Sequence, residues 1–477
     1  MEKDLRNFLE RHRASDPVSF HMPGHKGMAL FEENGLGGFI KNLAGYDITE
    51  ITGADNLFQP ETVIARVMEK YRGLYGTKKS YLLINGSSAG IIASVMTALP
   101  EGGRLIMARN SHKSVYNALR LVRGEPVYVY PGMIPEYGIQ GAIDPGEIAL
   151  ALDENPDAKA VILPSPNYYG VCSDISAIAE EVHRRGGILI VDQAHGAHLK
   201  FFGPDYGLPG AAEDMGADIV INSTHKTLAS FTQTAVLNVC SDRVDTEDLE
   251  DRLQMIESSS PSYPLMATLD INAGLLIEKG RELIRCWAED ISYFYDEAKS
   301  IKGLKVMDTE DLDRTKINLD MSGRGFDGDA LENFLMERGI YPELVSGNIV
   351  MCMSGIGNRR GDYERLLEAL REASELSEGA PGKAPSEDIS DSARGDYSGE
   401  RLEKTAIPQS RESIPLRMAE GRVCASLIIP YPPGIPIACP GEILTAGAVE
   451  KIFSARSSGR KVIGVSEDLR ITVGRQL

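Results

Sequence analysis

The sequence of 477 residues lacks the features that mark exported, membrane-spanning or disulfide-rich proteins. Its six cysteines lie far apart and form no CxxC pair, a usage typical of a reducing compartment. No uncharged apolar run of about 18 residues is present to cross a membrane. The charged residues 1–13 lack the apolar core of a signal peptide. We therefore predict a cytoplasmic protein.

Positively charged residues are outnumbered by negatively charged ones. The chain has 50 Lys and Arg against 69 Asp and Glu, a net charge of −19, which disfavours nucleic acid and anionic membrane as partners. Hydrophobic residues make up 42% and charged residues 25%, which excludes collagen-like, coiled-coil and wholly disordered classes. No Walker loop or nucleotide-type GxGxxG stands at a strand-to-helix turn.

The length predicts about three domains at roughly 150 residues each. Short β-branched or aliphatic runs alternate with amphipathic stretches of ten or more residues, which indicates βαβ units. The stretch 377–413 is rich in Ser, Gly, Pro, Asp and Glu, and we interpret it as a flexible linker. The predicted divisions are an N-terminal arm (1–60), a major domain (61–264), a smaller α/β domain (265–376), the linker (377–413) and a C-terminal domain (414–477).

Seven candidate strands in the major domain predict a large, doubly wound and mostly parallel sheet. They are Ser80–Ile84, Arg104–Ala108, Val127–Tyr130, Ala160–Pro164, Ile188–Val191, Ile219–Asn222 and Ala235–Val239. Ligands of such sheets bind at the carboxyl ends of the strands, so polar residues that directly follow these strands are the candidates for function.

Lys226, in Ser223-Thr-His-Lys226, follows one of these strands, and Asp192 ends another. A solvated loop lysine is the alternative for any lone lysine, but the two residues are expected to converge at one sheet edge. Together they are what a pyridoxal phosphate site requires: an amine for the Schiff base and a carboxylate for the pyridine nitrogen.

Two further loops follow strands at the same edge. Asn85-Gly-Ser-Ser-Ala-Gly90 precedes a helix, so Ser87, Ser88 and the backbone amides can face a phosphate, although a plain turn has the same composition. His112 can stack on a cofactor ring or serve as a buried structural histidine. The pairs His21/His25 and His195/His198 invite a metal interpretation, but Pro23 and Gly24 separate the first pair and no Cys cluster is present. We predict no metal site.

At this point the sequence resembles the Orn/Lys/Arg decarboxylase family, pyridoxal-phosphate enzymes of fold type I (the aspartate aminotransferase fold). The likeness covers about residues 15–445 without the linker and is closer to the short bacterial arginine decarboxylases than to the long inducible enzymes. The segments that carry it are His21-Met-Pro-Gly-His-Lys-Gly27, Tyr46-Asp-Ile-Thr-Glu-Ile51, Val191-Asp-Gln-Ala-His-Gly-Ala-His198, Ser223-Thr-His-Lys226, Ser260-Pro-Ser-Tyr263 and Ile429-Pro-Tyr-Pro-Pro-Gly-Ile-Pro436.

The resemblance implies Lys226 as the Schiff-base lysine, Asp192 as the partner of the pyridine nitrogen and His112 stacked on the ring. It implies further cofactor contacts from Ser87, Ser88, Ala194, His195, Ser223 and His225. Family dimers share their active sites, so the resemblance implies a homodimer or higher homo-oligomer in which Ser259 or Ser260 reaches the neighbouring subunit's phosphate. Gln193 departs from the Glu that short members often have, which leaves the polarity near the ring open.

The reaction that the resemblance implies is decarboxylation of a basic amino acid. Its likeness to the short bacterial arginine decarboxylases implies L-arginine as the substrate, agmatine and carbon dioxide as the products, and a place in polyamine biosynthesis. Glu343, in Tyr341-Pro-Glu-Leu, is the candidate partner of the cationic side chain, with a solvated loop glutamate as the alternative; Asp47, Glu50 and Asp55 come next. Lysine or ornithine as substrate, an aminotransferase or aldolase-type reaction and a cofactor-free regulatory homologue all remain open.

Overall fold

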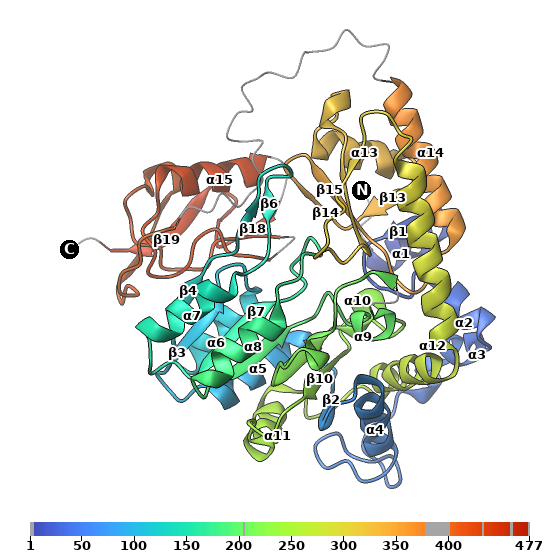
Figure 1. Ribbon diagram of the computed structural model, residues 1–477, viewed down its shortest axis with the longest axis horizontal. Helices are drawn as coiled ribbons and strands as arrows, with labels where there is room; N and C mark the ends of the chain where they lie inside the picture. The colour runs from blue at the N-terminus through green and yellow to red at the C-terminus, as the bar shows by residue number, and fades with distance from the viewer. Residues whose placement is uncertain (1–3, 204–205, 377–400, 432–433, 458–460, 476–477) are drawn as a thin grey trace.

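The computed structural model of the protein describes residues 4–203, 206–376, 401–431, 434–457 and 461–475. Figure 1 shows a large sheet domain, a smaller domain beside it and a C-terminal module on the opposite flank of the sheet. The predicted linker residues 377–400 lie outside the described residues, as do residues 432–433 of the segment Ile429–Pro436.

The large sheet has seven strands in the order β2-β10-β9-β8-β7-β3-β4. All neighbours pair in parallel except β10, which is antiparallel to both β2 and β9. The strands are β2 (Lys79–Leu83), β3 (Arg104–Ala108), β4 (Glu125–Val129), β7 (Ala160–Pro164), β8 (Ile188–Asp192), β9 (Ile219–Asn222) and β10 (Ala235–Val239). The predicted fold class is confirmed, and each strand lies within two residues of its predicted bounds.

Helices cover both faces of this sheet, because side chains alternate between the faces along each strand. Leu105 and Met107 of β3 pack in the core under α5 (Gly86–Ala98), α6 (Lys113–Leu121) and α11 (Thr246–Ile256). Ile106 and Ala108 of the same strand pack on the other side, under α7 (Pro145–Glu154) and α8 (Ile175–Arg184). A third core lies between α4 (Val63–Tyr75) and the strands β2, at the sheet edge, and β10 beside it.

The smaller domain follows the 36-residue helix α12 (Tyr263–Ala298), which begins at the N-cap Ser262. Its antiparallel sheet has the order β11-β12-β15-β14 and packs against α13 (Gly328–Glu337) and α14 (Arg360–Leu376). The four strands are β11 (Lys305–Val306), β12 (Lys316–Asp320), β14 (Leu344–Ser346) and β15 (Ile349–Met353).

Part of the predicted arm belongs to this smaller domain. Strand β1 (Val18–Phe20) pairs in parallel with β13 (Ile340–Pro342), and Phe20 is fully buried against Tyr363 at a ring distance of 5.6 Å. The sequence predicts an arm without a core here, because a three-residue strand is too short to show a period of two. The arm thereby places Met22 at the boundary between the two domains.

The C-terminal module has its own core around α15 (Ala446–Ser457). It contains two strand pairs, β16 with β19 and β17 (Ile429–Tyr431) with β18 (Lys461–Ile463). Residues 401–413, predicted as linker, lie along it. Thr405 N donates to Gly441 O, and β16 (Arg411–Pro415) pairs with β19 (Arg470–Gly474). Backbone hydrogen bonds order this stretch, and a composition poor in apolar residues does not reveal them.

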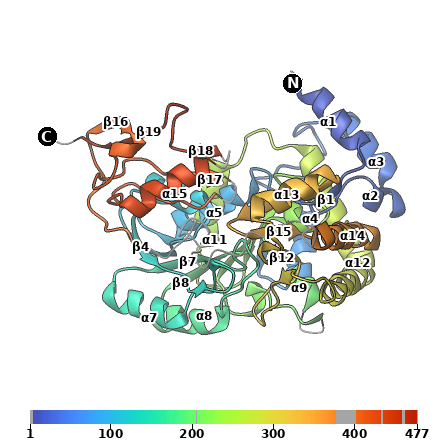
Figure 2. The same ribbon diagram turned by 90° about the horizontal axis from the view of Figure 1, so that it is seen from above.

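A buried ion pair joins the module to the large domain. Arg109 Nε and Nη2 lie 3.1 and 3.0 Å from the two carboxylate oxygens of Glu442, and Arg109 Nη1 donates to Pro436 O at 2.8 Å. Glu442 is 1% exposed. Because Arg109 directly follows β3, this two-pronged contact fixes the position of the loop that carries His112. Figure 2 shows the module seated beside the large sheet, away from the smaller domain.

Candidate active site

A cavity of about 360 Å³ opens where the parallel strands of the large sheet end. The loops after β2, β3, β7, β8 and β9 all contribute to its wall, as expected for an open α/β sheet. The described lining residues from these loops are Gly86, Ser87, Ser88, Asn110, His112, Lys113, Pro164, Pro166, Tyr168, Asp192, Ala194, His195, His225 and Lys226. The remaining lining residues are Met22, Thr232, Gln233 and Ile435.

Lys226 and His195 are in direct contact inside this cavity. Lys226 sits in the short helix α10 (Thr224–Thr227) after β9, and its Nζ lies 2.8 Å from His195 Nε2. Burial lowers the pKa of Lys226 and lowers the pKa of His195 well below its usual value. The imidazole is therefore neutral and can accept a hydrogen bond from the amine at Nε2.

Asp192 ends β8 and faces the same cavity, with 7% of its surface exposed. Its carboxylate accepts a hydrogen bond from Ala194 N at 3.2 Å. Burial raises its pKa, while the nearby Lys226 acts in the opposite direction. Such a buried carboxylate is stabilised in its charged form by a cationic partner, and a protonated pyridine nitrogen is one that fits.

The loop after β2 forms the part of the cavity suited to an anion. Gly86 has a φ of +77° and begins α5, so the first amides of the helix and the hydroxyls of Ser87 and Ser88 lie at a helix N-terminus. Glu257 Oε2 accepts hydrogen bonds from Ile84 N at 3.3 Å and Asn85 N at 3.0 Å and holds the loop from behind.

His112 is fixed as the N-cap of α6. Its Nδ1 accepts a hydrogen bond from Ser114 N at 3.3 Å and lies 2.9 Å from Ser114 Oγ. Burial lowers the pKa of His112 to about 3, so the ring is neutral. A neutral ring with a fixed orientation on the cavity wall can stack on a planar ligand.

Ser223 and His225 precede Lys226 by three residues and one residue in the sequence. His225 lines the cavity, and its Nδ1 lies 2.7 Å from Thr234 O. Ser223 is fully buried, and its Oγ has no hydrogen-bond partner within the described part of the chain. Asn110 Oδ1 has none there either. Buried polar atoms left without protein partners, next to a cavity, indicate a polar ligand.

The residues present therefore fit pyridoxal phosphate: an amine, a buried carboxylate opposite it, a stacking ring and an anion-binding helix end. They do not indicate a metal. Among the described residues, no group of three or more His, Cys, Asp or Glu is arranged to hold one. His25 instead packs against Phe31 and Phe231.

Several predicted residues lie outside the described lining, Ser223 among them. Glu343 stands behind it: Oε2 accepts from Met22 N at 3.0 Å, and Oε1 accepts from Tyr168 OH at 2.9 Å. Its role as the substrate's partner stays a prediction. Ser259 and Ser260 lie in the exposed loop before α12, where Ser260 N donates to Ser258 Oγ. Their proposed reach into a neighbouring subunit also stays a prediction.

Gln193 points away from the cavity. Its Nε2 donates to Glu213 Oε2 at 2.9 Å and to Asn222 Oδ1 at 3.0 Å, and its Oε1 accepts from Ala212 N. A glutamate at this position would face the carboxylate of Glu213. The amide therefore suits its neighbour, and the polarity of the cavity is set by other residues.

Sequence reasoning missed several lining residues. Tyr168 comes four residues after β7, and its ring lies 4.5 Å from the ring of His195. A search of the residues that follow every predicted strand would have identified it. Gln233, with a φ of 87° and Nε2 donating to Ile84 O at 2.7 Å, and Ile435 of the C-terminal module carry no comparable local signal.

Comparisons with known proteins agree with this geometry. The family profile "Orn/Lys/Arg decarboxylase, major domain" matches residues 4–319, and the profile of the C-terminal domain of the same family matches residues 396–470. An arginine decarboxylase of Bacillus subtilis is 31% identical, over 97% of this chain and 95% of its own length.

More distant relatives share the same architecture. The lysine decarboxylase LdcA of Pseudomonas aeruginosa is 22% identical, over 97% of this chain and 77% of its own length. The solved structure of the constitutive lysine decarboxylase of Escherichia coli superposes with a TM-score of 0.76 at 20% identity, covering 98% of this chain and 82% of that one. This last likeness shows the fold.

Proposed function

This chain belongs to the Orn/Lys/Arg decarboxylase family, and from that premise we propose that it decarboxylates L-arginine to agmatine with pyridoxal phosphate as cofactor. The observation that carries the proposal is the convergence of Lys226, Asp192, His112 and the Ser87–Ser88 loop on one cavity. The relative named as an arginine decarboxylase is 31% identical, and the one named as a lysine decarboxylase 22%, which favours arginine.

Each side chain has a task that its surroundings support. When bound, pyridoxal phosphate supplies an electron sink for the carbon–carbon bond that breaks. Lys226 would supply the amine that holds the cofactor and that the substrate amine displaces. Asp192 would hold a proton on the pyridine nitrogen, His112 would pack on the ring, and Ser87, Ser88, Ser223 and His225 would hold the phosphate.

His195 holds the amine of Lys226 in place. A lysine attacks only as the free amine, which burial favours by lowering the pKa of Lys226, and the neutral imidazole 2.8 Å away can accept a hydrogen bond from that amine at Nε2. Lys226, once protonated, can return a proton to the carbon that loses carbon dioxide. Ala194 and Tyr168 line the cavity beside Lys226 and His195.

Substrate choice rests on Glu343. A guanidinium buried without a partner is costly, and the carboxylate of Glu343 has acceptor capacity beyond its bonds to Met22 N and Tyr168 OH. Of the other candidates, Asp55 is committed: its two oxygens accept hydrogen bonds from backbone amides including those of Asn56, Glu61 and Thr62.

The deciding experiment incubates the purified protein and pyridoxal phosphate with arginine, lysine or ornithine. Carbon dioxide release and mass spectrometry of the amine then identify reaction and substrate together. Agmatine from arginine is the expected result. Cadaverine or putrescine reassigns the substrate, a keto acid without carbon dioxide indicates an aminotransferase, and a protein without absorbance above 400 nm indicates a cofactor-free homologue.

The proposal extends to assembly and setting. Tyr46, Ile48 and Ile51 of the arm are exposed at 43%, 44% and 56%, an apolar surface that a second copy of the chain can cover in a homodimer. Light scattering measures whether the protein is a dimer in solution.

Among the described residues no helix is both long and apolar enough to cross a bilayer. We propose that the protein is a cytoplasmic enzyme of polyamine synthesis.

A further inference from the structure

A buried ion cluster lies next to the cavity without being part of its described lining. Lys316 begins β12, Asp313 lies three residues before it, and His198 lies in the loop after β8; all three are fully buried. Burying charges is costly even when they are paired. The hydrogen bonds of the cluster show which neighbouring residues it holds in place.

Lys316 directs its ammonium to three acceptors. Its Nζ donates to Asp313 Oδ2 at 2.7 Å, to Thr315 Oγ1 at 3.1 Å and to the backbone carbonyl of His195. The last bond reaches from the smaller domain to the residue whose ring touches Lys226. It fixes the backbone from which the His195 imidazole projects.

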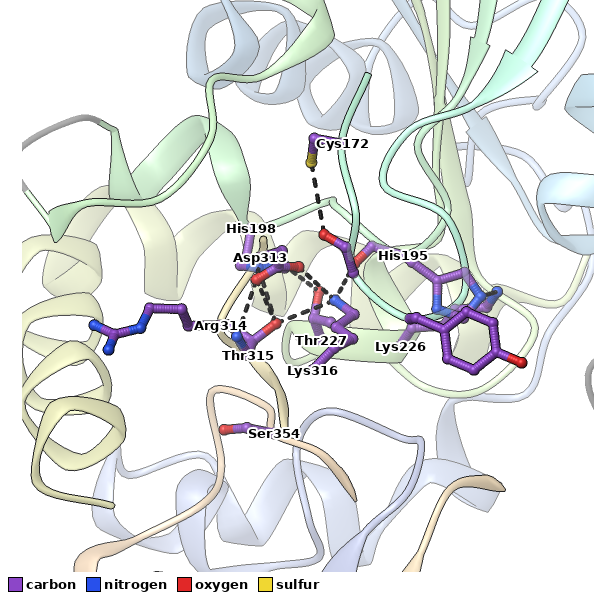
Figure 3. Close-up of polar contacts among 12 residues, drawn as sticks. Cys172, His195, His198, Lys226, Thr227, Asp313, Arg314, Thr315, Lys316 and Ser354 are labelled. Atoms are coloured by element: carbon purple, nitrogen blue, oxygen red, sulfur yellow. Dashed lines mark hydrogen bonds and ion pairs between the residues drawn. The ribbon is translucent and has the colours of Figure 1, made fainter. Parts of the chain in front are cut away.

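His198 extends the cluster to the other partner. Its Nε2 lies 3.1 Å from Asp313 Oδ1, and its Nδ1 lies 3.1 Å from Thr227 Oγ1. Thr227 directly follows Lys226. The cluster therefore holds both sides of the contact between Lys226 and His195, one through a carbonyl and one through a hydroxyl, as Figure 3 shows.

We propose that Asp313, Lys316 and His198 form a positioning cluster that fixes Lys226 Nζ against His195 Nε2, so that the smaller domain sets the geometry of proton transfer at the active-site lysine. This inference rests on the proposed function, because it assigns a task to Lys226. None of the three residues touches the cavity, so they act through Lys226 and His195.

Charge gives the cluster a measurable signature. The titratable groups that face Lys226 from the surrounding elements are Asp192, Glu343, His112, His195, His225 and Lys316. After burial, Lys316 is the group that lowers the pKa of Lys226, whereas Asp192 and Glu343 raise it. Removing the Lys316 ammonium therefore raises the pKa of Lys226.

The main test compares Lys316→Met with Arg314→Met. Arg314 carries the same charge two residues away but points away from the site, toward Asp308 at 2.7 Å and the ring of Tyr295. The first readout uses apoprotein: trace acetylation over a range of pH, with mass spectrometry of the Lys226 peptide. The second is kcat and KM of the holoenzyme.

We expect Lys316→Met to move the midpoint of Lys226 labelling to higher pH than in the wild-type protein. We also expect kcat to fall about tenfold or more with KM changed less than about threefold, because geometry rather than binding is lost. Arg314→Met leaves both readouts at the wild-type values. A wild-type midpoint and kcat in Lys316→Met, or equal effects of the two variants, overturns the proposal.

Thr227→Val tests the cluster if Lys316→Met does not fold. The substitution keeps the shape and removes only the hydroxyl that contacts His198, and Thr227→Ser restores that hydroxyl. We expect a fall in kcat of about three- to tenfold in Thr227→Val and recovery in Thr227→Ser. Equal activity of the two overturns the proposal. A wild-type protein that releases no carbon dioxide contradicts the proposed function instead, while the apoprotein labelling still reports on the cluster.

Discussion

The two sides of the cavity are built in different ways. One side consists of residues at the ends of strands of the large sheet or within four residues after them, such as Asp192, His112 and Lys226. The ladder of backbone hydrogen bonds fixes where these strands end. The other consists of Met22 and Ile435, with Glu343 behind them, from the arm, the C-terminal module and the smaller domain. Under the proposed function, the sheet side carries the groups for bond breaking, and the assembled side is left to select the substrate.

Lys226→Ala breaks the sheet side most completely. No other amine in the described lining occupies that strand end, so we expect kcat to fall by about a thousandfold or more. Absorbance above 400 nm is lost in the same variant. A protein that keeps both the visible band and normal turnover would remove Lys226 from its role.

Asp192→Asn keeps the shape of the sheet side and removes its charge. An opposite charge at contact shifts a pKa by about 1–3 units, so we expect turnover to fall about 10- to 1000-fold while the cofactor still binds. The pH dependence of the visible spectrum and steady-state rates measure both. Wild-type rates would mean that another group holds the pyridine proton.

Glu442→Gln tests how the assembled side is attached. It leaves Arg109 buried beside a neutral partner, and we expect the free energy of unfolding to fall by about 3 kcal/mol. Denaturant titration measures this. The matched control Glu289→Gln breaks the exposed pair Arg285–Glu289 and is expected to cost less than about 1 kcal/mol. Equal losses would show that the Arg109–Glu442 pair does not hold the module.

Glu343→Gln tests selection by the assembled side. If Glu343 pairs with the guanidinium, kcat/KM for arginine falls. The decrease corresponds to a loss of about 1.5–3 kcal/mol of transition-state stabilisation, and the cofactor absorbance is unchanged. Tyr168→Phe removes the hydroxyl that Glu343 accepts from and keeps the carboxylate. If both variants lose arginine use equally, Glu343 acts by holding Tyr168. If neither does, the search moves to Asp47 and Glu50.

The smallest effect is expected outside both sides. Replacing residues 377–400 by a Gly/Ser chain of equal length should change kcat/KM less than about twofold, because that composition offers little apolar area to a core. The replacement spares 401–413, which bond to the C-terminal module. Lost activity with normal solubility would make 377–400 part of the site.

Sequence alone placed the sheet side well because strand ends are local signals. Asp192 and Lys226 each follow an aliphatic run, and parallel strands bring such ends together. The assembled side depends on tertiary contacts that no short pattern encodes. The pairs Met22–Glu343 and Arg109–Glu442 span 321 and 333 residues, and the partner of Gln193 proved to be Glu213.

The Arg109–Glu442 pair also imposes an order in time. A ribosome adds about 5–20 residues per second, and the two residues are 333 positions apart. The arginine beside the His112 loop therefore waits about 17–67 s for its carboxylate to be synthesised. During that interval the strands and helices between them can fold, but the support of His112 from the C-terminal module is missing. A nascent or truncated chain cannot complete its cavity early, and the active site matures only when synthesis is nearly finished.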